Sequence, residues 1–466
     1  MYSNDMPMLT RSSLKLAVDR GFVWRLAGTA VPVALQALTS ASRTVVDSFL
    51  VSRLGAAEVA AVGYSSRVIF VVMMAVMGMS DGGAVVVAQF WGRGDVARTR
   101  QATALTTAAV ALISVASCVA CFVWAEQIAR LGTSDPAVVE LATGYLRSVI
   151  LMIIPFALIS AFASSLRCLG SAWVAMAFSA VGLALHLALS YCLIFGNGGL
   201  PALGLTGAAL ATVISTFVEC GMFVAYIYGR RHPMAFRARD LVIGFRNRLL
   251  RKIRKVAVPV LFSSVSWAVG IMVFGVLVGN AGVRELAVLS LVTPIESAVV
   301  AIVHGVATAS AVLIGNSLGE GVDDAHIWQI TKALMMWNIS IAALLSGLLV
   351  LTSLGMRTIY GGIDDETLDV AQQTTLVLAA LFLFRATGMI LQNGLLRAGG
   401  DTVYILYADA AFQWLVAIPL TFLAIFVWHL PFPLVYACIY TEEIARTVVS
   451  GYRVYRRRWM GRLAEH

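Results

Sequence analysis

The stretch of sequence that decides the fold is Thr107–Trp124, TAAVALISVASCVACFVW, which contains no charged residue. Comparable apolar runs recur along the chain, for example at Ile341–Leu354 and its flanks. In hydrocarbon each backbone amide must find its hydrogen-bond partner within its own segment, so a long apolar run folds as a helix of about 20 residues. A membrane β-barrel would instead show weakly alternating segments of about 10 residues. The runs therefore predict an all-α membrane protein.

The composition excludes an ordinary soluble protein. Of the 466 residues, 59% are hydrophobic and 13% are charged, whereas soluble domains are about half apolar and about a quarter charged. A water-soluble chain of this length would lack the charges needed to cover its surface. We therefore expect a lipid bilayer to be the solvent of most of the chain.

The distribution of charge indicates the topology. The formal net charge is +9, and ten Lys and Arg residues lie between Arg230 and Lys255, where Asp240 is the only acid. Basic residues clustered between apolar runs mark cytoplasmic loops, so the pattern favours a membrane topology over a nucleic-acid partner. The other basic segments, including both ends of the chain, fall on the same side, which predicts cytoplasmic termini.

Twelve apolar spans can be delimited along the chain. Several exceed about 25 residues, so some helices must tilt, bend or project from the bilayer. The spans are expected near residues 25–52, 58–89, 101–124, 137–166, 172–196, 205–228, 255–279, 285–315, 328–354, 367–396, 402–427 and 432–453.

The chain repeats itself at a nearly constant offset. Ala30–Val33 returns as Ala257–Val260, 227 positions later, and Leu166–Gly170 resembles Leu396–Gly400 at an offset of 230. Repetition at one offset indicates two six-helix halves in the same orientation. Parallel repeats are a recurring plan of secondary transporters, whose substrate site lies between the halves.

The repeat implies a domain organisation with two hinges. Pro32 and Pro259 occupy equivalent positions inside the first and seventh spans, where proline removes a helix hydrogen bond and permits a bend. The expected parts are a cytoplasmic N-terminal segment (1–24), an N-lobe with the first six spans (25–228), a basic cytoplasmic linker (229–254), a C-lobe with the last six spans (255–453) and a cytoplasmic tail (454–466).

Two acidic motifs precede spans. Asp135-Pro136 is typical of a helix N-cap followed by proline at the first helical position. Asp364-Asp365 begins a D-D-x-x-x-D run that resembles a metal or diphosphate site. Because no similar run stands opposite it, a helix cap on an outer loop is the better interpretation.

Motifs spread along the chain resemble those of the multidrug and toxic compound extrusion (MATE) family. They cover essentially the whole chain, and their order and spacing are more specific than any one of them. In the first half they are Gln36, Val46-Asp47, Val51–Gly55, Gly78, Gly82, Val87–Gln89, Gly92, Leu166-Arg167, Gly170 and Leu193–Gly196, and in the second Glu296-Ser297, Gly315, Leu318-Gly319, Leu396-Arg397, Gly400–Thr402, Trp414 and Ile418–Leu420.

The resemblance implies a V-shaped bundle of two six-helix lobes that exports cationic or amphipathic compounds in exchange for H+ or Na+. The details around Glu296-Ser297 and the end of the chain are more similar to the bacterial DinF-like or related branches. We therefore expect a multi-pass protein of a bacterial inner membrane, acting as a monomer.

Asp47, deep in the first span, is the main candidate for ion coupling. A charge at that depth needs a partner or a purpose, and the resemblance implies that this carboxylate is the proton or Na+ site of the N-lobe. The alternative is a structural pair with Arg43, one helical turn earlier. Where the family commonly has Asn and Asp in the fifth span, this chain has His186 and Ser190. The usual second carboxylate is therefore missing, and His186 is a candidate proton carrier because imidazole titrates near neutral pH.

Glu296, in the eighth span, is the C-lobe candidate for binding a cation or a drug. The seventh-span glutamate and tenth-span aspartate of sodium-coupled NorM-like relatives are replaced, near Ser264–Trp267 and Arg385. This argues against sodium coupling of that type. Arg385 is a candidate to neutralise Glu296 or Asp409, and Asp81 is a further secondary candidate for coupling.

A second set of residues suits an amphipathic substrate cavity, because aromatic and Met side chains adapt to varied ligands. Packing between helices is the alternative for each of them. The cavity candidates are Gln36, Trp267, Met272, Gln392 and Asn393. Other ionisable residues in the spans remain candidates for the cavity or for structural pairs, namely Arg67, Arg147, Glu219, His304, Glu442 and Glu443.

These patterns favour a proton-coupled antiporter that works by alternating access and needs no cofactor beyond its coupling ion. A Na+-coupled drug antiporter is the first alternative. A flippase for lipid-linked oligosaccharide is the second, and it would line its cavity with basic residues such as Arg43, Arg67, Arg147 and Arg385. A membrane-embedded enzyme would need clustered catalytic groups, whereas the six His residues are dispersed.

Overall fold

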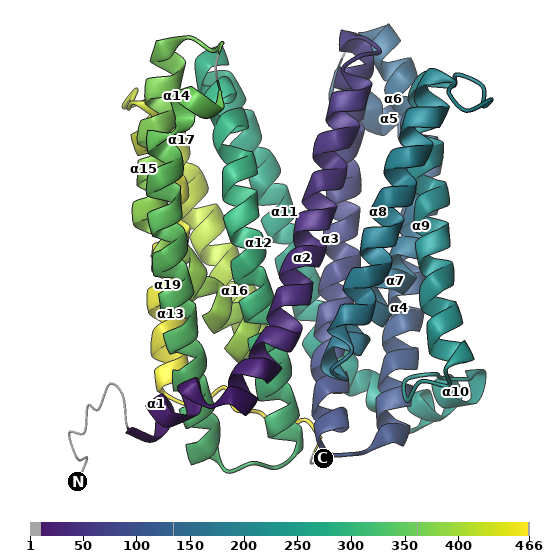
Figure 1. Ribbon diagram of the computed structural model, residues 1–466, viewed down its shortest axis with the longest axis vertical. Helices are drawn as coiled ribbons and strands as arrows, with labels where there is room; N and C mark the ends of the chain where they lie inside the picture. The colour runs from purple at the N-terminus through teal and green to yellow at the C-terminus, as the bar shows by residue number, and fades with distance from the viewer. Residues whose placement is uncertain (1–10, 134, 361, 465–466) are drawn as a thin grey trace. The chain divides into compact units, whose positions relative to one another are not determined.

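The computed structural model describes residues 11–133, 135–360 and 362–464, which form helices and contain no strand (Figure 1). Eleven helical stretches in these ranges are long and apolar enough to cross a membrane, which confirms the expected all-α membrane fold. They are α2 (Arg20–Val51), α3 (Ala56–Gly92), α4 (Val96–Val123), α6 with η1 and α7 (Pro136–Val149, Ile150–Met152, Ile153–Cys168), α8 (Ala172–Phe195), α9 (Gly204–Gly229), α11 (Leu249–Ala281), α12 (Val283–Gly319), α13 (Asp324–Leu354), α15 with η2 (Asp365–Met389, Ile390–Leu396), and α16 with η3 and α17 (Thr402–Phe412, Gln413–Ala417, Ile418–Phe426).

The twelfth span is divided into two shorter helices. They are α18 (Phe432–Ile439) and α19 (Thr441–Tyr455), and they meet at Tyr440. The Tyr440 N–H donates to Tyr436 O at 3.3 Å and Tyr440 O accepts from Ile444 N–H at 3.3 Å, so hydrogen bonding continues across the junction. The short helices outside the spans are α1 (Arg11–Val18), α5 (Ala125–Arg130), α10 (Ala238–Arg246) and α14 (Met356–Ile359).

Both acidic motifs cap helices, as their sequences predict. The Asp135 carboxylate accepts from the Ala137 N–H at 2.9 Å at the start of α6, with proline at the first helical position. The Asp364 carboxylate accepts from the Thr367 N–H at 2.8 Å at the start of α15. These bonds satisfy amides that have no partner inside the helix.

The tenth and eleventh spans contain π-helical turns. These are η2, which continues α15, and η3, which lies between α16 and α17. Both pack against α19. Because π-helical turns are rare and frequently lie at functional sites, η2 and η3 mark this part of the chain as a candidate site.

The helices form two compact units. The N-terminal unit comprises Leu35–Trp91 and Asp95–Met272, and the C-terminal unit comprises Gly92–Gly94 with the described residues before Leu35 and after Met272. The division falls inside α2, shortly after Pro32, and inside α11, after Pro259. Each of these two helices therefore belongs to both units.

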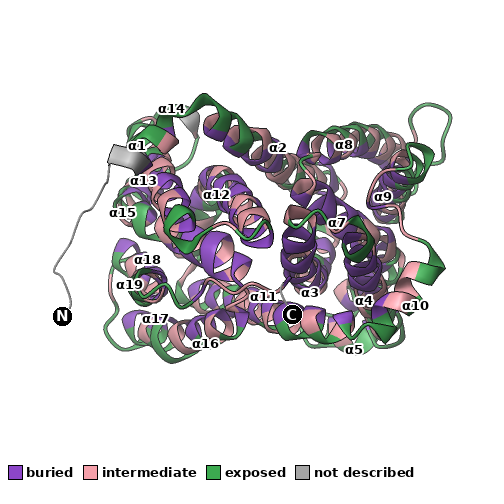
Figure 2. Ribbon diagram, turned by 90° about the horizontal axis from the view of Figure 1, so that it is seen from below, coloured by how far each residue is buried: buried purple, intermediate pink, exposed green. Residues whose placement is uncertain are grey.

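Small residues let helices of the N-terminal unit approach closely. A Cβ on Gly82 of α3 would lie 2.4 Å from the Ala257 Cα of α11, and one on Gly207 of α9 would lie 2.4 Å from the Leu193 carbonyl oxygen of α8. Such contacts are typical of membrane helix packing, because in lipid the hydrophobic effect does not bring helices together and close van der Waals packing does. Figure 2 shows many buried residues along α3, α4 and α7.

The last described residues are part of the C-terminal unit. The Trp459 side chain is 1% exposed and packs so close to Gly399 that a Cβ there would meet the Trp459 carbonyl oxygen at 1.9 Å. Arg462 Nη2 donates to Val322 O at 2.9 Å and lies 2.9 Å from the Asp324 carboxylate. This segment ties the turn before α13 to the turn before α16.

The first helix packs onto the same unit. The Trp337 Nε1–H of α13 donates to the Ala17 carbonyl oxygen of α1 at 3.0 Å. Phe22 and Leu26, in the first turns of α2, are 2% and 4% exposed and belong to the same apolar core as Trp459. The start and the end of the chain therefore share one core.

Candidate functional site

Polar side chains of three helices meet inside the N-terminal unit. On α2 and α8 they are spaced by seven and four residues, which places them on one face of each helix; α9 adds two more. They are Gln36, Arg43 and Asp47 of α2, Ser179, His186 and Ser190 of α8, and Ser215 and Glu219 of α9. We call these eight residues the N-terminal polar group.

Asp47 contacts His186 directly. The Asp47 Oδ1 and His186 Nε2 atoms are 2.8 Å apart. The His186 side chain is fully buried, whereas the Asp47 side chain is 23% exposed. Ser190 Oγ lies 3.5 Å from His186 Nε2 and Ser215 Oγ lies 3.5 Å from Nδ1. Both ring nitrogens thus have polar neighbours, so the imidazole can hold a proton on either side.

Arg43 does not pair with Asp47, the alternative that its spacing suggests. It pairs instead with Glu219, with 3.6 Å between Arg43 Nη2 and Glu219 Oε2. Ser179 Oγ donates to Glu219 Oε1 at 2.8 Å, and Gln36 Nε2 donates to Ser179 Oγ at 3.0 Å. Glu219 therefore supplies a second carboxylate to the unit, from α9 rather than from α8.

The sequence leaves Glu219 open between the cavity and a structural pair, and one further signal favours its place in the site. Thr212, Ser215, Thr216 and Glu219 form a buried polar stripe with helical spacing on α9, which is mostly apolar. Across from the stripe, a Cβ on Gly182 of α8 would lie 2.6 Å from Glu219 Oε2. The glycine makes room for the carboxylate, but the pairing of the two helices cannot be read from either sequence alone.

The N-terminal polar group contains two carboxylates and one arginine. Asp47 and Glu219 each contribute one negative charge when ionised, Arg43 contributes one positive charge, and neutral His186 contributes none. The net charge is therefore −1. In a membrane such a charge favours the uptake of a proton or a cation.

Glu296 is held by three donors inside the C-terminal unit. The hydroxyl groups of Tyr436 and Tyr440 donate to its two oxygens at 2.6 Å and 2.8 Å. Arg385 Nη1 lies 3.0 Å from Glu296 Oε1 and also 3.8 Å from Glu443 Oε1. Of the two partners that the sequence suggests for Arg385, the structure places it on Glu296.

The other secondary candidates are also in ion pairs. Asp409 Oδ1 lies 3.1 Å from Arg446 Nη1 in the C-terminal unit. Arg446 Nη2 lies 2.7 Å from the Glu443 carboxylate, which the sequence left unassigned. Asp81 of α3 is 3.5 Å from Arg167 of α7 in the N-terminal unit.

The predicted cavity residues are divided between the two units, and most of them have contacts within their own unit. Gln36 belongs to the N-terminal polar group, whereas Gln392 is buried in η2 and donates to Ser450 Oγ at 3.3 Å. The Asn393 side-chain oxygen accepts from Arg397 Nη2 at 2.5 Å. The remaining two lie on α11, where the Trp267 ring is 6.2 Å from the Phe70 ring and Met272 is half-buried.

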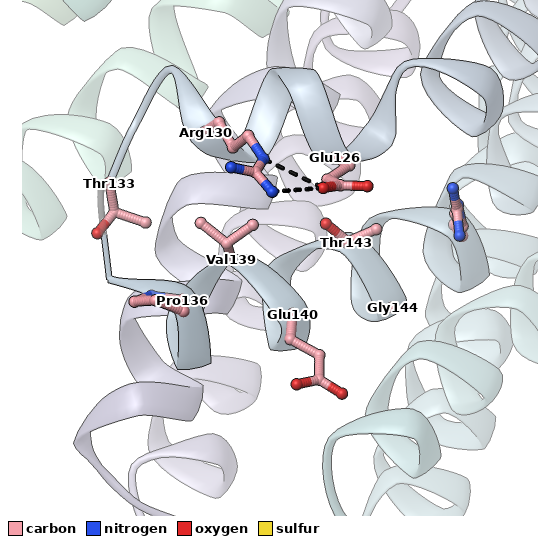
Figure 3. Close-up of a pocket in the computed structure, with 9 residues that line it drawn as sticks. Glu126, Arg130, Thr133, Pro136, Val139, Glu140, Thr143 and Gly144 are labelled. Atoms are coloured by element: carbon pink, nitrogen blue, oxygen red, sulfur yellow. Dashed lines mark hydrogen bonds and ion pairs between the residues drawn. The ribbon is translucent and has the colours of Figure 1, made fainter.

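A pocket of about 720 Å³ lies elsewhere in the N-terminal unit, around α5 and α6 (Figure 3). Figure 3 shows the ion pair between Glu126 and Arg130, whose charged atoms are 2.7 Å apart. The residues that line the pocket are different from the N-terminal polar group, which lies on α2, α8 and α9. The lining residues are Glu126, Arg130, Thr133, Pro136, Val139, Glu140, Thr143, Gly144 and Arg147.

Comparison with known proteins supports the duplication and identifies relatives. A family model described as MatE matches the chain twice, at residues 32–192 and 259–423. The two matches begin at Pro32 and Pro259, the same offset of 227 positions that the repeated motifs show. This confirms that the chain consists of two related halves.

The similar proteins extend over most of the chain. An uncharacterised transporter of Bacillus subtilis, YisQ, is 26% identical and the alignment covers 90% of each chain. A probable multidrug resistance protein NorM of Rhizobium meliloti is 28% identical, with 82% of this chain and 84% of the relative covered. A solved outward-facing multidrug resistance MATE transporter superposes with a TM-score of 0.84 at 18% identity, over 96% of this chain and 98% of the other.

Proposed function

Because the chain belongs to the MatE family of membrane transporters, we propose that it is a secondary active antiporter that exports cationic or amphipathic compounds in exchange for protons. It would act as a monomer in a bacterial inner membrane, with both termini in the cytoplasm. Relatives whose names record multidrug resistance support the export of such compounds.

The observation that carries the proposal is the contact between Asp47 and His186. The carboxylate and the imidazole are 2.8 Å apart, close enough to share one proton in a direct hydrogen bond. Asp47 is partly exposed while His186 is fully buried. The carboxylate is therefore the side of the pair that exchanges protons with water, and the imidazole holds it in place.

The net charge of the N-terminal polar group explains why a proton and an organic cation would exchange for each other. With Asp47 and Glu219 ionised and Arg43 as the one cation, one proton neutralises the group, and so does one monovalent organic cation. The group therefore favours one of the two at a time. Exchange of one proton for one monovalent cation moves no net charge, so the pH difference drives it, and a tenfold proton gradient supports an organic-cation gradient of about tenfold.

A hinge near Pro32 would couple proton binding to movement. Pro32 lies in the part of α2 that belongs to the C-terminal unit, and Asp47 lies in the part that belongs to the N-terminal unit. Protonation of Asp47 weakens its contact with His186, which fixes the second part of α2 to α8. A bend at proline then changes the direction of the first part, as alternating access requires.

The contacts of Asp47 support protons over sodium ions. When the His186 Nε2 carries its proton it donates to Asp47 Oδ1, and a donor at that oxygen competes with a sodium ion for the same lone pairs. A sodium-coupled antiporter remains the alternative for the coupling ion.

The arginine side chains weigh against a flippase for lipid-linked oligosaccharide. A flippase would present them to the anionic head group of its substrate. Arg43 instead pairs with Glu219 and Arg385 with Glu296, while Arg147 Nε donates to the Phe122 carbonyl oxygen at 3.3 Å. These contacts occupy three of the four candidate arginines.

The test is transport of ethidium, a fluorescent organic cation, by the purified protein in liposomes. A pH gradient and a sodium gradient are imposed separately. We expect transport to follow the pH gradient and to be abolished in Asp47→Asn, with Ser48→Ala, a variant of the neighbouring residue, as the control. Transport driven by sodium alone would overturn the choice of ion, and wild-type transport by Asp47→Asn would overturn the site.

A further inference from the structure

A second group of charges lies where the irregular spans of the C-terminal unit meet. We call it the C-terminal acidic cluster. Its charged members are Glu296 of α12, Arg385 of α15, Asp409 of α16, and Glu442, Glu443 and Arg446 of α19, with the hydroxyl groups of Tyr436 and Tyr440 at the α18–α19 junction.

The C-terminal acidic cluster has more carboxylates than cations. It holds four carboxylates and two guanidinium groups, so its net charge is −2 if every group is ionised. The side chains of Asp409, Glu442, Glu443 and Arg446 are each less than a tenth exposed. An unbalanced charge is costly at such burial, and a buried acid then takes up a proton instead.

Three of the four carboxylates are held by close donors. Glu296 accepts from two tyrosines and contacts Arg385 at 3.0 Å, Asp409 contacts Arg446 at 3.1 Å, and Glu443 contacts the same guanidinium at 2.7 Å. Each of these contacts favours the ionised form, because charge-assisted hydrogen bonds are short and strong.

Glu442 is the exception. Its Oε1 is 3.8 Å from Arg446 Nη2, which is too far for a hydrogen bond. Its Oε2 is buried and has no hydrogen-bond partner, and the whole residue is 5% exposed. An ionised carboxylate oxygen left without a donor loses its hydration and gains nothing in return. The geometry therefore points to Glu442 as the carboxyl group that carries the proton.

The backbone around Glu442 allows the proton to leave again. Glu442 lies in the first turn of α19, next to the junction with α18 at Tyr440. The unpartnered Nε–H groups of Arg385 and Arg446 are two further donors within the C-terminal acidic cluster. Helix α19 packs against the π-helical segments η2 and η3, which are places where a helix can shift its register locally.

We propose that Glu442 binds and releases a proton during transport, as a second proton site separate from Asp47. The step moves one proton from water onto a carboxylate oxygen of Glu442 and returns it to water on the other side, with no electron transferred. The role of Glu442 in transport rests on the proposed antiport. If both are right, two protons are exchanged per cycle, one at Asp47 and one at Glu442. The protonated carboxyl group itself can be detected without transport.

The first test is infrared spectroscopy of the purified protein at pH 7, in H2O and D2O. A protonated carboxyl group in an apolar site gives a C=O stretching band, separate from the bands of carboxylates, that shifts in D2O. We expect this band in the wild type and in Asp47→Asn, and its loss in Glu442→Gln. Glu126→Gln, the same change at an exposed ion pair, is the control and should keep the band.

A conservative variant distinguishes loss of the carboxyl group from misfolding of the Gln variant. Glu442→Asp keeps a carboxyl group and should move the band without abolishing it, whether or not Glu442→Gln folds. A wild-type spectrum without the band, or a Glu442→Gln spectrum that keeps it, would overturn the proposal.

The second test is the number of protons exchanged per ethidium in liposomes with the membrane potential held at zero. For two protons, a tenfold proton gradient balances an ethidium gradient of about a hundredfold, and for one proton about tenfold. We expect two for the wild type and one for Glu442→Gln. An unchanged number in the variant would overturn the role in transport. A wild type that keeps the infrared band but shows no proton-driven transport would instead overturn the proposed antiport.

Discussion

The Asp47 carboxylate lies 2.8 Å from the His186 imidazole, although 139 positions separate the two residues in the sequence. The contact joins α2 to α8. Because α2 begins in the C-terminal unit and ends in the N-terminal unit, the contact holds down one end of a helix that both units share. A change in its protonation therefore acts on a segment that reaches beyond the N-terminal unit.

Replacing His186 with Gln tests whether the imidazole carries protons or only donates a hydrogen bond. Glutamine keeps a donor near Asp47 Oδ1 but does not titrate. We expect ethidium transport to fall at least about tenfold, equivalent to about 1.4 kcal/mol, and its pH dependence to change shape while ethidium binding persists. A variant with the wild-type rate and pH profile would leave His186 a structural residue.

The pair between Arg43 and Glu219 should be revealed by a double-mutant cycle. Glu219→Gln leaves a guanidinium without its counter-charge next to a buried amide, which we expect to cost about 1–3 kcal/mol of stability. The Arg43 side chain is 23% exposed, so water recovers part of the loss. The double variant Arg43→Gln with Glu219→Gln should regain stability, because neither charge is then left alone.

Denaturation of the purified protein in detergent, monitored by tryptophan fluorescence, measures these differences. The Arg130→Gln and Glu126→Gln pair, which is solvent-exposed, provides the matched cycle and should show almost no coupling. Additive effects of the two changes at Arg43 and Glu219 would contradict the pairing.

Gly82 should tolerate no side chain, whereas Gly63 in the same helix should tolerate one. A Cβ on Gly82 would come within 2.4 Å of a backbone atom of α11, which cannot move aside, while a Cβ on Gly63 meets nothing within 4 Å. Gly82→Ala should therefore lower stability by about 1–3 kcal/mol through overpacking. Gly63→Ala should be neutral or slightly stabilising, and equal effects of the two in thermal denaturation would refute the close approach.

The cap at the start of α15 should make stability depend on acid pH. Hydrogen bonds from the backbone N–H and then the hydroxyl group of Thr367 lower the pKa of Asp364. A lowered pKa stabilises the fold at pH values above the unfolded pKa of about 3.9, and this contribution is lost as pH falls through the folded value. Asp364→Ala should therefore lower the melting temperature at pH 7 and lose this effect in strong acid.

The adjacent Asp365 provides the control for this prediction. Its side chain is 84% exposed and is 3.9 Å from Arg357, so Asp365→Ala should change the melting temperature little at either pH. A drop for Asp364→Ala that persists unchanged in strong acid would show that the ionised cap is not its cause.

Sequence alone predicts the features that depend on local or periodic patterns. Apolar runs predict the spans, because backbone amides in hydrocarbon can pair only within their own helix. Asp135 and Asp364 are recognisable as caps, because a capping bond spans only two or three residues. The repeat around Pro32 and Pro259 also follows from spacing, and the two matches to the family model begin at these residues.

The contacts within the site could not be predicted in the same way. Spacing suggested Arg43 as the partner of Asp47, but a side chain on a membrane helix also meets those on neighbouring helices, and Glu219 lies nearer. The unpartnered oxygen of Glu442 depends on where α16 and α19 place Asp409 and Arg446. Such geometry requires the packed helices, since no sequence pattern records the distance between them.

The shared core of the first and last segments has a consequence for biosynthesis. Ala17, Phe22 and Leu26 leave the ribosome before most of the spans, but their core includes Trp459, which follows all of the described spans. Nearly all of the N-terminal unit, in contrast, is continuous in the chain and can assemble as soon as α11 enters the bilayer. The core around the opening helices therefore cannot be completed until α19 and Trp459 have been synthesised.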